Sequence, residues 1–97
     1  MMGMRGTPTR IEYTVRIWRE GDQYIAHAMP IDVASAGASP EQARQALDEA
    51  VGLFLSVARE QGTLHDILEE CSYEFRDGSW RSPECVAIEQ RSAQLVA

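Results

Sequence analysis

The sequence predicts an α+β fold in which a three-stranded antiparallel sheet packs on one long helix, in the chain order β-β-β-α. Residues 40–60 carry apolar side chains three and four positions apart, which is the spacing of an amphipathic helix. Residues 11–20 alternate between apolar and polar, as a half-buried strand does, and residues 23–36 hold two shorter runs that suit strands. A short helix and C-terminal strands follow, so we expect residues 1–97 to form a single domain.

The long helix has a start signal and a stop signal. Ser39 is suited to accept a hydrogen bond from the first turn, Pro40 fits the first helical position, and Gln42 can reach back toward the cap. Gly62 can adopt the left-handed conformation that closes the last turn. These signals place the ends of the helix close to residues 40 and 60.

One side of this helix is apolar and needs a sheet to cover it, because such a helix is unstable alone in water. The apolar stripe consists of Ala43, Ala46, Leu47, Ala50, Val51, Phe54, Val57 and Ala58. Leu53 and Leu55 lie beside the stripe and widen it. We expect these two leucines to contribute to an interface between copies of the chain.

Three runs before the helix predict the sheet. The first strand, in residues 11–20, gathers on one side Ile11, Tyr13, Val15 and Ile17. Residues 23–29 form the second strand, which Pro30 ends because proline has no N–H to donate to a ladder. Residues 33–36 suit a short third strand, and Gly37 is expected to break it.

The pattern after the long helix predicts a short helix and further strands. Thr63 is the expected N-cap of the short helix, whose packed side holds Leu64, Ile67, Leu68 and Cys71. Asp77 and Gly78 are a hairpin turn signal, and a final strand is expected from Cys85 toward the C-terminus. In a cytosolic chain, Cys71 and Cys85 are expected to be small, buried, reduced thiols.

Acidic residues outnumber basic residues by 15 to 9, which gives a net charge of −6. Most of the excess lies in residues 41–70, which hold seven acids and two bases. Direct binding to nucleic acid is disfavoured, because it depends on neutralising phosphates with cations. The charge favours a basic protein partner, and it is equally compatible with a solvated face that keeps the protein in solution.

No part of the chain approaches the roughly 20 apolar residues that a membrane-spanning helix needs. Residues 1–9 also have no apolar core of the signal-peptide type. We therefore expect these residues to be a frayed lead-in, and the protein to be cytoplasmic and to make no contact with a membrane.

Few residues suggest chemistry. His27 and His65 have no second ligand at metal-binding spacing, and no serine or cysteine lies in a nucleophile motif. The carboxylates considered for a metal site are Glu12, Asp32, Asp48 and Glu49. They should not converge, because Asp48 and Glu49 lie on the polar side of the helix and Glu12 on the polar side of its strand. We expect no catalytic residue, no metal site and no cofactor.

The order of these elements resembles the HicB-like antitoxin family over most of the chain, from Ile11 onward. The residues that carry the resemblance are Tyr24, Ala26, Ala28, Pro30, Gly37, Ser39, Pro40, Glu41, Ala43, Ala46, Leu47, Ala50 and Phe54, followed by Gly62, Thr63, Leu64 and Ile67 to Glu70. Their order carries the resemblance, since no single motif among them is diagnostic.

The resemblance implies a partial ribonuclease-H-like fold without nuclease activity. It also implies the antitoxin of a type II toxin–antitoxin system, which binds and neutralises HicA, a small basic toxin that cleaves mRNA, and which forms dimers or larger assemblies such as tetramers. Many relatives carry a C-terminal DNA-binding module. Here the C-terminal region has no basic helix, so we expect no such module and no direct operator binding by this chain.

The corner Ile31-Asp32-Val33 replaces a glycine-containing corner of the family, which suggests an altered loop for contacting the partner. The expected toxin contacts are residues at strand ends beside it: Trp18, Arg19, Glu20, Met29, Ile31 and Asp32. The alternative for each is an ordinary loop or edge residue. Two other functions stay open, an orphan oligomeric scaffold or regulator of the same fold and a residual nuclease or RNA-binding protein.

Overall fold

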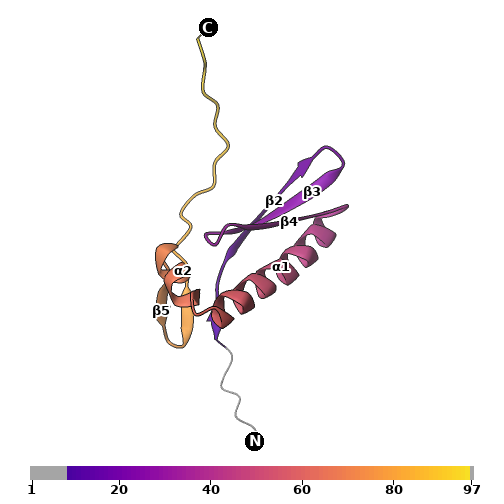
Figure 1. Ribbon diagram of the computed structural model, residues 1–97. Helices are drawn as coiled ribbons and strands as arrows, with labels where there is room; N and C mark the ends of the chain where they lie inside the picture. The colour runs from indigo at the N-terminus through magenta and orange to yellow at the C-terminus, as the bar shows by residue number, and fades with distance from the viewer. Residues whose placement is uncertain (1–8, 97) are drawn as a thin grey trace, which may run out of the picture.

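The computed structural model describes residues 9–96 (Figure 1). Its elements are β1 (Arg10–Ile11), β2 (Thr14–Glu20), β3 (Gln23–Met29), β4 (Val33–Gly37), α1 (Pro40–Glu60), α2 (Leu64–Glu70), β5 (Glu74–Arg76) and β6 (Ser79–Arg81). The α+β class, the three-stranded antiparallel sheet and the two helices are confirmed. The predicted lead-in over residues 1–9 lies outside the described residues, apart from an exposed Thr9.

The strands form two sheets, β2-β3-β4 and the smaller β1-β6-β5. β1 and β2 are successive parts of the predicted first strand, which is interrupted at Glu12 and Tyr13. β6 pairs with β1 in parallel and places Trp80 opposite Ile11. The first strand therefore contributes to both sheets and joins the two halves of the molecule.

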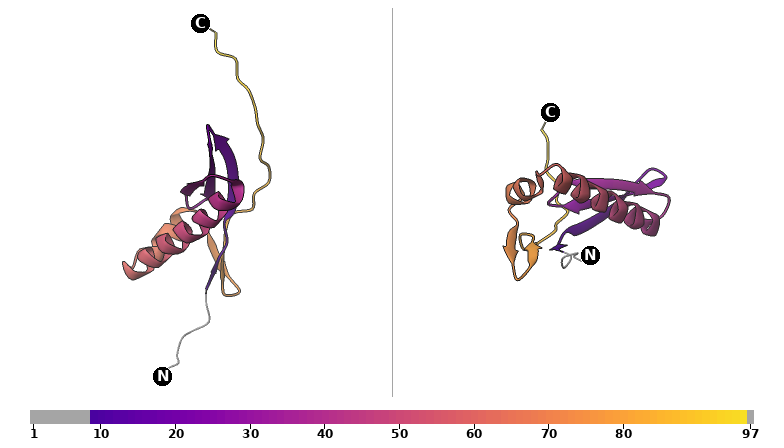
Figure 2. Two further views of the ribbon diagram at one scale, coloured as in Figure 1. Left: turned by 90° about the vertical axis from the view of Figure 1, so that its right-hand side faces the viewer. Right: turned by 60° about the horizontal axis from the view of Figure 1, so that its bottom comes forward.

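α1 covers one face of the larger sheet and lies mainly over β3 and β4 (Figure 2). Its start is as predicted, because Ser39 Oγ accepts the Gln42 N–H at 3.1 Å. Gln42 Oε1 in turn accepts the Ala38 N–H at 3.1 Å. At the other end, Gly62 has a φ of 76°, the left-handed conformation expected of it. The predicted bounds of the long helix are confirmed.

The core lies between α1 and the larger sheet and extends to α2. Its buried residues are Ala26, Ala28, Ile31, Ala43, Leu47, Val51, Leu68 and Tyr73. The two small alanines of β3 allow the helix to approach the sheet closely. Two predictions for α1 need correction. Leu55, expected at an interface between copies, packs against the core, and Val57, expected in the apolar stripe, is exposed.

Gly37 continues β4 and pairs with Tyr24, so the prediction that it breaks the strand is wrong. A Cβ atom at this position would lie 2.5 Å from the backbone nitrogen of Ala43. The absence of a side chain therefore serves the close approach of the first turn of α1 to the end of β4.

The second half of the chain follows the predicted order as far as β6. The hairpin between β5 and β6 turns at Asp77 and Gly78, whose φ angles of 52° and 77° suit a tight two-residue turn. Thr63 precedes α2, but its hydroxyl makes no capping bond and donates instead to the Ala58 carbonyl at 3.3 Å. This bond ties the start of α2 back to the end of α1.

The predicted final strand from Cys85 is wrong. Residues 82–96, called the C-terminal arm below, form neither helix nor strand and run away from the body as an extended segment (Figure 1). The principal extents of 65 × 29 × 22 Å reflect this projection. Cys71 is half-buried and Cys85 is exposed, and both thiols are free, so the expected burial of Cys85 is also wrong.

Candidate protein-binding face

The larger sheet has one face that α1 does not cover. Ala26 and Ala28 of β3 are buried on the helix side, so the residues between them point to the opposite face. The strand register aligns the side chains of this face in two rows, which we call the open face: Trp18, Ile25 and Ala36 in one, Arg16, His27 and Ala34 in the other. Figures 1 and 2 show α1 on one side of the larger sheet and no helix on the other.

Trp18 is held in one position on the open face by polar neighbours. Its indole N–H donates to Glu20 Oε2 at 2.7 Å, and the Arg16 guanidinium lies 4.8 Å from the ring centre. The edge of the His27 ring completes the contacts, with 6.2 Å between ring centres. A half-buried indole that is already positioned loses little side-chain entropy on binding, and tryptophan is enriched among residues that dominate binding energy.

His27 connects Trp18 to the corner after β3. Its Nε2 lies 2.6 Å from Asp32 Oδ1, and the Asp32 side chain is 86% exposed whereas that of His27 is 23% exposed. Asp32 is positioned by its backbone, with a φ of 63° and an N–H that donates to the Ala28 carbonyl at 2.8 Å. The open face thus presents an apolar and aromatic strip that ends in an exposed carboxylate.

The six residues predicted to contact a partner do not form one patch. Trp18, Arg19 and Glu20 lie toward the β2–β3 turn, whereas Met29 and Asp32 lie at the other end of β3. Ile31 is buried in the core and is unavailable to a partner, which corrects that prediction. Ile31 lies just after β3 and belongs to the same buried cluster as Leu47 and Val51 of the α1 stripe.

His27 links the two groups, but the sequence analysis considered it only as a metal ligand without a partner and did not place it in a binding face. The alternation of β3 could have placed His27 on the open face. It lies between two alanines that are buried under the helix, so its own side chain must face away from the helix. Its diagonal contact with Trp18 required the strand register, which the sequence alone does not give.

A second uncovered apolar surface lies on the flank of α1. Leu53 is 67% exposed, as its predicted role in an interface requires, but Leu55 packs against the core. An open cavity of about 370 Å³ runs beside Leu53 toward α2, and its apolar lining includes Phe54, Val57 and Ile67. We call this cavity the α1 flank groove.

The ionisable side chains of the described residues form separate pairs such as His27 with Asp32 and His65 with Glu69. Within residues 9–96 no three metal-binding side chains come together, so the carboxylates considered for a metal site stay apart. Asp48 accepts a hydrogen bond from the Tyr13 hydroxyl at 3.0 Å. Burial raises the pKa of Tyr13, and the hydrogen bond and negative charge of Asp48 raise it further. These contacts attach α1 to the first strand.

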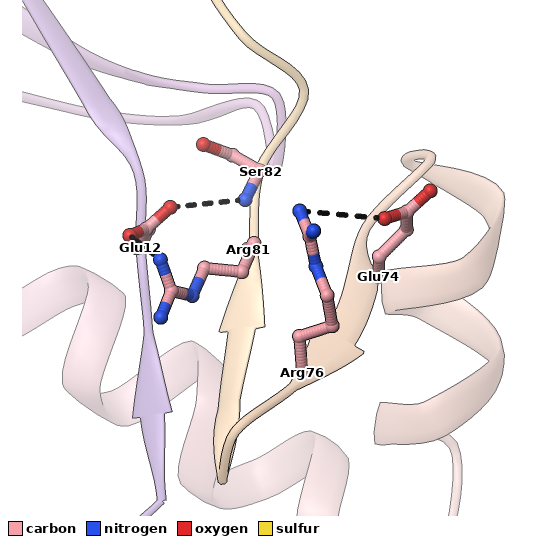
Figure 3. A network of polar contacts seen from close by, with 5 residues as sticks. All are labelled: Glu12, Glu74, Arg76, Arg81 and Ser82. Atoms are coloured by element: carbon pink, nitrogen blue, oxygen red, sulfur yellow. Dashed lines mark hydrogen bonds and ion pairs between the residues drawn. The ribbon is translucent and has the colours of Figure 1, made fainter.

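Glu12 connects the first strand to the root of the C-terminal arm (Figure 3). Its Oε1 accepts the Ser82 N–H at 3.3 Å, and its Oε2 lies 4.0 Å from the Arg81 guanidinium. On the neighbouring β5, Arg76 and Glu74 form an ion pair at 3.7 Å. The arm therefore leaves the body from a fixed point beside the first strand.

None of the described helices has the length and apolar character needed to cross a membrane. Comparison of the chain with protein-family models, with curated proteins and with solved structures finds no match.

Proposed function

We propose that this protein is a non-catalytic, HicB-like antitoxin that acts in the cytoplasm and neutralises a HicA-like mRNA interferase by direct binding. The observation that carries the proposal is the open face, where Trp18 is held in place between Arg16 and His27 without being covered. An uncovered aromatic strip on a rigid sheet is typical of a protein-binding surface.

The topology supports the proposal. A hairpin, a third antiparallel strand and a long helix are followed by β6, which returns in parallel beside the first strand. This is the order implied by a partial ribonuclease-H-like fold, although here β6 pairs with β1 and not with β2.

Charge supports a basic partner. The net charge is −6, and the exposed Asp32 carboxylate ends the open face. Opposite charges on two partners accelerate their encounter more than they tighten the complex. We therefore expect association with a basic toxin to slow as salt concentration rises.

The experiment is to co-express this chain with the small basic protein encoded beside its gene. We expect the two to co-purify, and this chain to restore growth of cells that express the neighbour. Trp18→Ala should weaken binding at least tenfold, because it removes the central side chain of the open face. Phe75→Ala is the matched control, since Phe75 is an exposed aromatic residue on the smaller sheet. The proposal fails if no neighbour binds, or if the two substitutions weaken binding equally.

A second candidate function is an orphan oligomeric scaffold or regulator of the same fold. The α1 flank groove and the exposed Leu53 favour it, because both suit contact between copies. A stable homo-oligomer whose gene has no toxin beside it would support this function over the antitoxin.

A further inference from the structure

The C-terminal arm carries large apolar side chains that its own chain leaves uncovered. Val86 is 88% exposed, Ile88 63%, Leu95 96% and Val96 89%. Four such residues in one extended segment are unusual on the surface of a monomer. An extended segment also has backbone N–H and C=O groups that a neighbouring strand can satisfy.

Residues 82 and 83, at the start of the C-terminal arm, end its pairing with the first strand of the same chain. Continuing the parallel register of β1 and β6 would place Pro83 beside Thr14. Proline has no N–H to donate, so the ladder between the first strand and β6 is interrupted there. Ser82 is meanwhile fixed by its hydrogen bond to Glu12 (Figure 3). Residues 82–85 line a small open cavity with Thr14, Met29 and Pro30, and beyond them the arm leaves the body (Figure 1).

β2 has an unpaired edge that is as long as the part of the arm that carries Val86 and Ile88. It pairs only with β3, and within residues 9–96 no strand lies along its other side. Val15 on this edge is 37% exposed, although its partner Ala28 is fully buried. The seven residues of β2 match the seven arm residues 84–90. An unpaired edge strand is a template for another strand.

Side-chain spacing and charge also match. Val86 and Ile88 are two positions apart, as Val15 and Ile17 are, so a strand added to β2 can place all four on one face of the sheet. β2 carries two arginines and one glutamate, a charge of +1, whereas residues 84–90 carry two glutamates, a charge of −2. The other free edge, β4, has no charged residue and only five residues.

We propose that the C-terminal arms of two copies are exchanged, so that residues 84–90 of each copy add a strand to the β2 edge of the other. Each copy has one arm and one β2 edge, so a two-fold dimer pairs both arms and both β2 edges. This inference does not depend on the proposed function, because it concerns the β2 edge and not the open face.

The first test measures the mass of the full chain in solution by light scattering during gel filtration. We expect a dimer. Val86→Asp with Ile88→Asp should convert it to a monomer, since both side chains are exposed in the single copy and their replacement does not disturb its core. The matched control is Ser92→Asp with Gln94→Asp, which adds the same charge to the arm beyond the paired segment. A monomeric full chain, or a dimer that survives the Val86 and Ile88 substitutions, would overturn the proposal.

The second test locates the arm. Cys71→Ser leaves Cys85 as the single thiol for a spin label, because the chain has only two cysteines. Labelled chains are mixed with ¹⁵N-labelled chains in which both cysteines are serine. Broadening should be strongest for the amides of residues 14–20 of the second copy. Strongest broadening around Leu53 and Val57 would place the arm in the α1 flank groove and would refute pairing at β2.

Discussion

The Tyr73 hydroxyl donates a hydrogen bond to the backbone carbonyl of Glu12, which lies 61 positions earlier in the chain. This bond connects the segment after α2 to the interruption between β1 and β2. The Glu12 side chain also accepts the Ser82 N–H, so one residue of the first strand receives contacts from two later segments. The second half of the molecule is therefore attached to the first at a point where the first strand is unpaired with β3.

Replacing Tyr73 with phenylalanine should lower the free energy of unfolding by about 1–3 kcal/mol, because it leaves the Glu12 carbonyl without its donor in a part-buried site. Urea unfolding monitored by circular dichroism measures this change. A loss below a few tenths of a kcal/mol would mean that water replaces the hydroxyl.

The same hydroxyl should make stability depend on alkaline pH. Burial, together with the nearby charges of Cys71 and Glu12, raises the pKa of Tyr73 from 10.0 to about 12. Because the folded state favours the protonated phenol, the stabilisation is complete below pH 10 and is lost as the pH rises toward 12. Tyr73→Phe is the control, since it should lack this part of the pH dependence. Parallel pH profiles for the two proteins would contradict the assignment.

Gly37→Ala should destabilise the fold by about 1–3 kcal/mol, because the added Cβ atom meets backbone atoms of Gln42 and Ala43 at 2.5–2.7 Å. Gly52→Ala is the matched control in the exposed middle of α1, where nothing lies within 4 Å of the added atom. That change should stabilise the protein by up to about 1 kcal/mol, because alanine is the better helix former. Thermal unfolding of both variants measures the two effects, and shifts of the same sign would refute the argument.

Leu47→Ala should cost about 2–5 kcal/mol, because Leu47 is fully buried between α1 and the larger sheet. Leu53→Ala removes the same atoms from an exposed position of the same helix and should change the stability of the single copy by less than about 0.5 kcal/mol. Chemical denaturation distinguishes the two. A comparable loss for Leu53 would mean that its side chain is covered in solution.

Ser39→Ala should lower stability by about 1 kcal/mol, because it removes the acceptor of the Gln42 N–H at the start of α1. Ser56→Ala, on the exposed side of the same helix, should cost nothing. Helix content measured during thermal unfolding tests the pair. Equal melting temperatures for the two variants would show that the cap contributes little.

Local patterns predicted α1 well because its caps and its apolar spacing lie within one continuous segment. Local patterns also predicted the range of β3, where the buried Ala26 and Ala28 are two positions apart. Local reasoning failed at Gly37, because a side chain there is excluded by the backbone of Ala43 and not by any neighbour in β4. It also failed for Ile31, because a corner residue is buried or exposed according to what packs on the corner.

The candidate binding face was less predictable than the fold. Trp18 was predicted as a partner contact, but its contacts with Arg16 and His27 depend on how β2 and β3 align. The arm shows the same limit. The apolar residues at positions 86 and 88 predicted a strand, but a strand needs a neighbour, and the single chain provides none within the residues described.

The sequence by itself determined the α+β class, the bounds of α1 and the range of β3, because caps, helical spacing and alternation act over a few adjacent residues. Only the tertiary structure decided that β6 returns beside β1, that His27 connects Trp18 to Asp32, and that the C-terminal arm leaves the body. These features depend on pairing between distant segments, and the energy of such pairing depends on register and packing that no local pattern specifies.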